Sequence, residues 1–335
     1  MYVNATIEAF LKLKDRINDE NDLLKEAAQK AYSKNAWFTL SSIDLAFKGI
    51  KNYLNKSDLN TWINTYDFPI VSQTIGIVMA GNIPMVGFHD LLCILVAGKS
   101  AHIKLSSEDD VLIPFLISEL IEINPLLEKR IKLVDKLKDV DAVIATGSNN
   151  SSRYFEYYFR NIPHIIRKNR TSIGILSGEE STEDLYKLGF DILQFYGLGC
   201  RNVSKIYVPK GYDFTNFFEA IQPHEEIIYQ SKYVNNYDYN KSIYLVNKDV
   251  FKDNGFLLVK EDKELVSPLS VLFYETYTNS QSLENQINGI SDNLQVIISK
   301  DATFKNSIAF GQSQSPRVWD YADNVDTIKF LISLS

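Results

Sequence analysis

The chain has 335 residues, of which 45% are hydrophobic and 23% are charged, and its formal net charge is −7. This is the composition of an ordinary globular protein, and at about 150 residues per domain its length predicts two domains. The negative charge argues against a protein that mainly binds nucleic-acid backbones, and two cysteines are too few for a disulfide framework or a cysteine-based metal site.

The N-terminal part predicts helices that cover a later sheet. Apolar residues recur at intervals of three and four over residues 7–13 and 23–28, and Ser41 with Ser42 would cap a further helix over 43–53. Because charged residues recur throughout, nothing here resembles a signal peptide, and we expect a cytoplasmic protein. The longest apolar run, 85–97, is too short to span a bilayer, so we expect no membrane span.

From Val71 onward, short apolar runs alternate with helical patterns. Strands separated by helices of this length predict βαβ units and a mostly parallel sheet. Ser106 to Asp109 has the composition of a helix cap. The predicted strands are 74–80, 101–105, 131–134 and 140–145, and the predicted helices are 85–96, 109–123 and 149–159.

A second alternation begins near residue 172. No linker rich in Gly, Ser or Pro precedes it, so the restart of the pattern is the sign of a domain boundary. The predicted strands are 171–176, 203–208, 255–260, 269–274 and 294–299, and the predicted helices are 181–195, 214–220, 225–234 and 282–288.

Cys200 is the first candidate for chemistry. Gly197 and Gly199 let the backbone turn sharply before it, and Arg201 beside it favours the thiolate, which is the nucleophilic form. The alternative is a small buried residue that follows a helix, since free cysteines are often buried. Cys93 lies inside the apolar run 91–95, where we expect a buried and inert thiol.

Three further candidates follow predicted strands. Asn82 comes after the first strand, where its amide could stabilise an oxyanion or simply form a turn. Gly147 and Ser148 open a helix, and their N–H groups could hold a pyrophosphate, although the chain has no Gly-x-Gly-x-x-Gly fingerprint. Lys104 ends an apolar strand and could contact a ribose or extend harmlessly into solvent.

The order of these features carries a resemblance. An Asn-x-Pro turn at Asn82, a strand ending in Lys104, a strand ending in Gly147-Ser148, and a glycine-flanked Cys200 ahead of a strand form an ordered set. The set resembles the aldehyde dehydrogenase superfamily, and within it the fatty-acid reductase of bacterial luminescence and its acyl-CoA reductase relatives. The tail over 310–327 is similar to the C-terminal segment of that reductase family. The resemblance covers residues 71–334.

The resemblance implies an α/β fold of the aldehyde dehydrogenase type. Residues 1–172 would hold the N-terminal helices and a Rossmann-type NADP-binding domain with a parallel sheet. Residues 173–310 would form a second α/β domain that bears the catalytic cysteine, and 311–335 would pack back near the cofactor domain.

The resemblance also implies roles for single residues. Cys200 matches the nucleophile and Asn82 the oxyanion-binding amide. The segment that begins at Glu264 stands where the superfamily has Glu-x-Phe-Gly-Pro, with Val266 and Ser267 in place of Phe and Gly. The implied cofactor-binding residues are Lys104, Ser106 and Ser107 at the adenosine ribose, Gly147 and Ser148 near the pyrophosphate, and Glu264 at the nicotinamide ribose.

Departures from the superfamily's pattern bear on the reaction. Oxidising aldehyde dehydrogenases have a Glu-Leu-Gly-Gly segment whose Glu activates water, whereas the corresponding stretch 165–171 has no carboxylate, which favours reduction. NAD-preferring members have a Glu three residues after the ribose lysine. Ser107 stands there and would not repel a 2′-phosphate, which favours NADPH, with NADH as the alternative. The chain is also short for the superfamily, so its oligomerisation arm is expected to be missing.

The sequence therefore predicts NADPH-dependent reduction of an acyl thioester to the aldehyde through a thioacyl-cysteine intermediate. The substrate would be an acyl-CoA, chiefly fatty acyl, or an acyl carrier, and the partners a second copy of the chain or acyl-transfer proteins. One alternative is an oxidising NAD(P)-dependent aldehyde dehydrogenase, with Glu179 or Glu180 as the base. Another is a non-catalytic assembly subunit with the same fold. We expect neither a metal nor nucleic acid.

Overall fold

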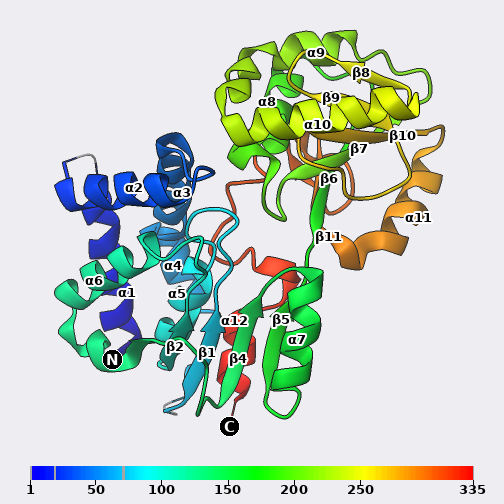
Figure 1. The fold of residues 1–335 in the computed structure, drawn as a ribbon. Helices are drawn as coiled ribbons and strands as arrows, with labels where there is room; N and C mark the ends of the chain where they lie inside the picture. Colours follow the sequence, from blue (N-terminus) through cyan, green and yellow to red (C-terminus); the bar gives the residue numbers. More distant parts are fainter. Residues whose placement is uncertain (1, 19, 70–71, 335) are drawn as a thin grey trace. The chain divides into compact units, whose positions relative to one another are not determined.

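The computed structural model describes residues 2–18, 20–69 and 72–334, so Val71, where the resemblance begins, lies outside the described residues. The chain divides into two compact units, drawn in Figure 1. Unit 1 consists of residues 1–169 and 316–335, and unit 2 of residues 170–315. The boundaries predicted from the sequence are 172 and 310.

Four helices open unit 1, and their apolar faces join the core of its sheet. Phe10, Phe47 and Trp62 are buried in the same cluster as Ile75 of the first strand. Thr39 caps the third helix by accepting a hydrogen bond from the Ser42 N–H, so the predicted Ser41-Ser42 cap lies inside the first turn instead. The helices are α1 (Tyr2–Arg16), α2 (Asp22–Lys34), α3 (Leu40–Tyr53) and α4 (Lys56–Ile63).

The sheet of unit 1, sheet A, is entirely parallel, as the alternation predicts. Its strand order is β3-β2-β1-β4-β5, so the order reverses between β1 and β4, as in doubly wound dinucleotide-binding folds. The strands are β1 (Thr74–Val78), β2 (Ser100–Lys104), β3 (Ile131–Leu133), β4 (Ala142–Thr146) and β5 (His164–Arg167); the helices between them are α5 (Phe88–Val96), α6 (Leu112–Ile123), the 3-10 helix η1 (Pro125–Arg130) and α7 (Asn149–Phe159).

Two of these helices begin later than predicted. Residues 84–87 form a turn before α5, in which Met85 has a φ of +59°. The run 106–109, expected to cap α6, instead forms a loop in which Ser106 Oγ accepts from the Glu108 N–H. The polar residues of this second segment are thus used in a loop and not in a helix cap. The strand β5 was not predicted.

Unit 2 is built on a seven-stranded sheet, sheet B, with the order β12-β11-β6-β7-β10-β9-β8. All its pairs are parallel except β8 with β9, which makes the sheet mixed. The strands are β6 (Thr171–Ile175), β7 (Val203–Pro209), β8 (Phe251–Asp253), β9 (Leu258–Glu261), β10 (Val271–Tyr277), β11 (Leu294–Ser299) and β12 (Ile308–Ala309); the longer helices are α8 (Thr182–Leu193), α9 (Thr215–Ile221), α10 (Ser231–Asn247) and α11 (Ser280–Ile290).

The clearest difference from prediction in unit 2 concerns α10. The predicted helix over 225–234 is in fact the 3-10 helix η3 (Gln222–Tyr229) followed by the start of the longer α10. Gln230 separates the two, and its side chain accepts from the Tyr233 N–H, which caps the new helix. The edge strand β8 and the short β12 were not predicted.

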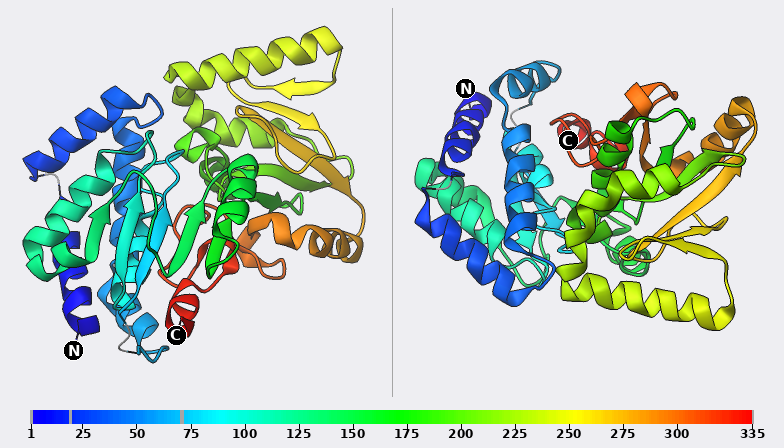
Figure 2. Two further views of the ribbon diagram at one scale, coloured as in Figure 1. Left: turned by 60° about the horizontal axis from the view of Figure 1, so that its bottom comes forward. Right: turned by 90° about the horizontal axis from the view of Figure 1, so that it is seen from above.

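The C-terminal segment, described over residues 316–334, packs within unit 1, where Figures 1 and 2 draw it in red. Its helix α12 (Thr327–Ser333) packs against α5, and Val318 and Ile328 join the unit 1 core. Tyr321 receives a 2.7 Å hydrogen bond from the indole N–H of Trp62. No helix among the described residues is long and apolar enough to cross a membrane.

Candidate active site

The candidate residues of unit 1 all follow the carboxyl ends of neighbouring strands of sheet A. Asn82 follows β1, Lys104 ends β2 with Ser106 and Ser107 just after it, and Gly147 with Ser148 follows β4. In the register of the sheet, Val78 at the end of β1 pairs with Lys104 on one side and Ala145 on the other. The three loops therefore share one edge of the sheet, which is where such folds bind ligands.

Gly81 brings two of these loops into contact. A Cβ atom at Gly81 would lie 2.6 Å from the Oγ of Ser106 and 2.8 Å from its Cβ, closer than side-chain atoms can approach. The loop that carries Asn82 thus packs directly on the loop that carries Ser106 and Ser107. Only glycine leaves room for this packing.

Asp109 ties the same two loops together. Its Oδ2 accepts a 2.6 Å hydrogen bond from the Met85 N–H in the turn after Asn82. The carboxyl is buried, its Oδ1 has no hydrogen-bond partner among the described residues, and burial raises its pKa to about 6. Asp109 therefore holds the backbone that presents Asn82, whose own side chain is exposed.

The candidate residues for the ribose and for the pyrophosphate differ in how far the fold itself already uses them. Lys104 and Ser107 are both exposed at the sheet edge. Ser148 Oγ caps α7 by accepting from the Ser151 N–H. A Cβ on Gly147 would lie 2.9 Å from Ser151 Cβ and from the ring of Phe155, so packing against its own helix requires this glycine. The packing of α7 thus requires glycine at position 147 whether or not a ligand binds there.

Cys200 lies in unit 2, in a tightly wound turn between the 3-10 helix η2 (Gln194–Gly197) and β7. Gly197 and Gly199 have φ values of +80° and +94°, which accounts for both glycines. Phe195 and Tyr196 also lie in the left-handed region, at +49° and +61°. Consecutive non-glycine residues in that region store backbone strain, which persists where surrounding contacts hold it and which occurs often at functional sites. The thiol-bearing residue is half-buried.

Hydrogen bonds hold the Cys200 turn on both sides. Ser172 Oγ donates to the Cys200 carbonyl at 3.0 Å, and the amide of Asn202 donates to the Ile192 carbonyl at the end of α8. Arg201 donates to the Ser313 carbonyl at 3.3 Å. Arg201 therefore anchors the turn to the end of unit 2 as well as placing a positive charge next to the cysteine.

Asp191, which was not singled out in the sequence, holds the segment 311–313 to which Arg201 binds. Its carboxylate accepts from the N–H groups of Gly311, at 2.6 Å, and of Ser313, at 2.9 Å. Burial raises its pKa to about 6. The signal in the sequence was an acidic residue beside the apolar end of a predicted helix.

Cys93 contrasts with Cys200. It is 0% exposed on α5, and its Sγ lies 3.9 Å from His89 Nδ1. Burial raises the pKa of its thiol well above the usual range, which disfavours the thiolate. Its environment is that of a structural cysteine.

Glu264 also lies in unit 2, with an exposed side chain, in the loop between β9 and β10. Its carbonyl accepts a hydrogen bond from the buried ammonium of Lys205, at 3.2 Å. Lys205 was not singled out in the sequence, although a charged residue inside the apolar strand 203–208 was a visible signal.

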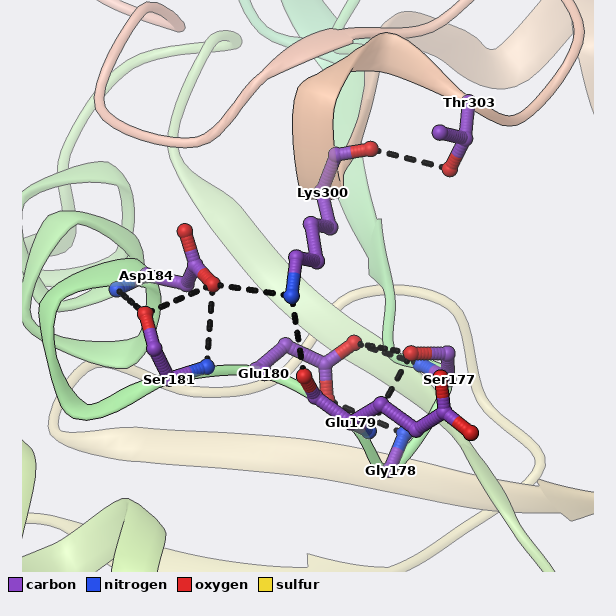
Figure 3. A network of polar contacts seen from close by, with 8 residues as sticks. All are labelled: Ser177, Gly178, Glu179, Glu180, Ser181, Asp184, Lys300 and Thr303. Carbon is purple, nitrogen blue, oxygen red and sulfur yellow. Dashed lines mark hydrogen bonds and ion pairs between the residues drawn. The ribbon is translucent and has the colours of Figure 1, made fainter.

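The alternative bases, Glu179 and Glu180, lie in the turn between β6 and α8 that Figure 3 shows from close by. The Glu180 carboxylate accepts from the N–H and hydroxyl of Ser177, at 2.6 and 2.8 Å, and from the Gly178 N–H at 3.0 Å. Glu179 is exposed, and its carbonyl accepts from Lys300. Glu180 is thus committed to forming its own turn, which argues against it as a hydrolytic base.

The stretch 165–171, which lacks the superfamily's glutamate, has a structural role in unit 1. Arg167 on β5 is 3% exposed and forms a 2.5 Å ion pair with Asp90 of α5. It also donates to Thr327 of α12 at 3.0 Å. Arg167 therefore links the edge strand to two helices. Among the described residues, no group of three or more His, Cys, Asp or Glu could hold a metal ion.

The model of the acyl-CoA reductase (LuxC) family matches residues 59–221. The chain resembles the acyl-CoA reductases. The matched stretch of this acyl-CoA reductase-like chain contains Asn82, Lys104 and Cys200, whereas Glu264 lies beyond it. A comparison with curated proteins found no match. The family match confirms the resemblance drawn from the sequence and supports an oxidoreductase that acts on an aldehyde or acyl group.

Solved aldehyde dehydrogenases share the fold of the acyl-CoA reductase-like chain at low identity. Aldehyde dehydrogenase 21 from Physcomitrella patens, in complex with the product succinate, is 12% identical with a TM-score of 0.68, covering 99% of this chain and 83% of that chain. An aldehyde dehydrogenase from Mycobacterium tuberculosis, complexed with NAD⁺, is 13% identical with a TM-score of 0.66, covering 89% and 73%. The predicted aldehyde dehydrogenase-like fold is therefore confirmed.

Proposed function

We propose that this chain reduces an acyl thioester, an acyl-CoA or acyl carrier, to the aldehyde, with Cys200 as the nucleophile and NADPH as the cofactor. The observation that carries the proposal is the Cys200 turn. Its strained backbone is held by Ser172, Arg201 and Asn202, and it lies in the stretch that matches the acyl-CoA reductase family.

The residues of unit 1 fit a dinucleotide. Strand order reverses between β1 and β4, and the exposed Lys104 and Ser107 lie at the same sheet edge. The first turn of α7, after Ser148, presents backbone N–H groups there. A bound NADPH would supply the hydride that reduces the acyl group. The structural neighbour from Mycobacterium tuberculosis is complexed with NAD⁺, and NADH is the alternative cofactor here.

The chain's own residues would carry the covalent steps. The Cys200 thiolate attacks the thioester carbonyl, the new C–S bond forms, and the CoA or carrier thiolate leaves. The Asn82 amide and the Cys200 N–H donate to the oxyanion, where one such donor is typically worth about 3–4 kcal/mol. After reduction, the hemithioacetal collapses, the aldehyde leaves and the Cys200 thiolate is regenerated.

The test is intact mass spectrometry after mixing the protein with acyl-CoAs of several chain lengths. Wild-type protein and Cys93→Ala should both gain the mass of one acyl group, whereas Cys200→Ala should gain none. An acyl adduct on folded Cys200→Ala, or its loss in folded Cys93→Ala, would show that the site is wrong.

Turnover assays distinguish the direction of the reaction. Acyl-CoA with NADPH should be consumed faster than aldehyde with NAD⁺ or NADP⁺. Faster oxidation of the aldehyde would identify an oxidising dehydrogenase. A protein that is neither acylated nor active in either direction would point to a non-catalytic subunit.

A further inference from the structure

Lys205 is a buried lysine in the middle of strand β7, and its side chain is only 1% exposed. A buried ammonium is costly unless its donors are satisfied. Here Nζ donates to the carbonyls of Lys263, at 3.0 Å, and Glu264, at 3.2 Å, and to Glu275 Oε2 at 2.8 Å. All three donors of the ammonium therefore have partners.

The charge partner of Lys205 is itself fixed. Glu275 lies on β10, which pairs with β7, and its other oxygen accepts from Gln286 of α11 at 2.8 Å. The carboxylate thus holds the ammonium in place from the sheet side. The other two donors of the Lys205 ammonium point at the loop between β9 and β10.

A second residue of β7 holds the same loop. Ser204 Oγ donates to the Leu265 carbonyl at 3.0 Å, and lies 2.7 Å from the hydroxyl of Thr171 on β6. Adjacent residues of β7, Ser204 and Lys205, therefore bind three consecutive carbonyls, those of residues 263 to 265. The main chain of Glu264 lies at the centre of this anchored segment, and its side chain is exposed.

We infer that Lys205 is a positioning residue for cofactor binding, because it fixes the backbone from which Glu264 reaches the nicotinamide ribose. This inference rests on the proposed function and on the role at the nicotinamide ribose that the resemblance implies for Glu264. A side chain held on a fixed backbone loses less conformational freedom when it binds a ligand. Removal of the ammonium should weaken cofactor binding through Glu264 and leave the sheet intact.

The test is titration of the unliganded protein with NADPH, followed by the nucleotide's fluorescence. Lys205→Met keeps the unbranched side chain up to the ε position and removes the ammonium with its donors. It should raise the Kd about 10-fold, as should Glu264→Gln. The double variant should bind no more weakly than Lys205→Met alone, because Glu264 is already misplaced there. Lys241→Met on α10 also removes an ion-paired lysine of unit 2, with Asp253 of β8 at 2.7 Å, and should leave the Kd unchanged.

Lys205→Arg keeps the charge and serves where Lys205→Met fails to fold. It should bind NADPH more weakly than wild type, by less than 10-fold, and the double variant with Glu264→Gln should bind no more weakly than Glu264→Gln alone. Two outcomes would overturn the inference and leave the proposed function standing. One is a double variant in which the two losses of affinity multiply, and the other is an unchanged Kd in a folded Lys205 variant while Glu264→Gln binds weakly. Wild-type protein that binds neither NADPH nor NADH would overturn the proposed function and this inference with it.

Discussion

At the scale of single residues, burial separates side chains that look alike in the sequence. Lys104 and Lys205 both belong to strands, but Lys104 ends its strand exposed, whereas Lys205 is buried with a full set of acceptors. Cys93 and Cys200 differ in the same way. The residue type sets the available chemistry, and the surroundings decide whether that chemistry is directed to a ligand or to the fold.

Asp109 should make stability depend on pH in a definite direction. Its pKa is raised from 3.8 to about 6, so the folded state binds the proton more tightly than the unfolded chain. The stability that protonation contributes is present below about pH 4 and lost as the pH rises to 6. Between pH 4.5 and 7.5, the stability of Asp109→Asn relative to wild type should therefore rise by about 2 kcal/mol.

Urea unfolding at the two pH values, followed by tryptophan fluorescence, measures this difference. All three tryptophans, Trp37, Trp62 and Trp319, lie in unit 1 with Asp109. A difference that stays constant with pH, or that moves against the variant, would contradict the raised pKa.

Ser107→Glu should shift cofactor preference from NADPH towards NADH. A carboxylate near the ribose repels a 2′-phosphate and can accept from a 2′-hydroxyl. The change should be roughly 1–3 kcal/mol in relative affinity, towards the lower value because the position is exposed. The ratio of kcat/KM for the two cofactors measures it. Ser118→Glu places the same charge on the exposed face of α6 and should leave the ratio unchanged, and a wild type that already prefers NADH would refute the premise.

At the scale of elements, the loops after β1 and β2 act as one structural piece. Gly81 packs on Ser106, and Asp109 accepts from the Met85 N–H. The turn before α5 and the late start of α6 follow from these tertiary contacts, which residue patterns within one segment do not reveal. The helix α7, whose signals are local, begins and ends where the sequence predicts.

Gly81→Ala should push these two loops apart. Its Cβ would meet Ser106 Oγ at 2.6 Å, and such overpacking typically costs about 1–3 kcal/mol. Ser106→Gly in the same protein should restore much of the lost stability. Gly49→Ala on α3 is the control, since a Cβ there has nothing within 4 Å and alanine favours helix. Thermal unfolding compares the variants, and a double variant no more stable than Gly81→Ala would disprove the contact.

At the scale of the whole molecule, the last 20 residues complete a unit that the first 169 begin. Trp62 donates to the Tyr321 hydroxyl. The Tyr66 hydroxyl lies 2.9 Å from the Tyr321 hydroxyl and donates to Asp326 Oδ2 at 2.8 Å. These bonds span more than 250 positions of sequence. The chain's end is therefore part of the core of unit 1.

Tyr321→Phe should destabilise unit 1 by about 1–3 kcal/mol, because it leaves the buried indole N–H of Trp62 without its acceptor. Tryptophan fluorescence reports this unit and should show the lower melting temperature. Tyr233→Phe removes a matched buried hydroxyl from unit 2, where it donates to the Phe256 carbonyl, and should leave the tryptophan transition in place. Equal shifts from both variants would show that the units unfold together.

The sequence by itself determined the features that depend on neighbours along the chain. Hydrophobic periodicity marked most strands and helices, the order of motifs indicated the acyl-CoA reductase resemblance, and the two glycines before Cys200 indicated its turn. Tertiary structure alone decided the strand order, the hydrogen bonds of Tyr321 within unit 1, and the contacts of Asp109, Asp191 and Lys205. The physical reason is that the role of a buried charged group depends on the partners that other segments place around it. The local sequence pattern does not contain those partners.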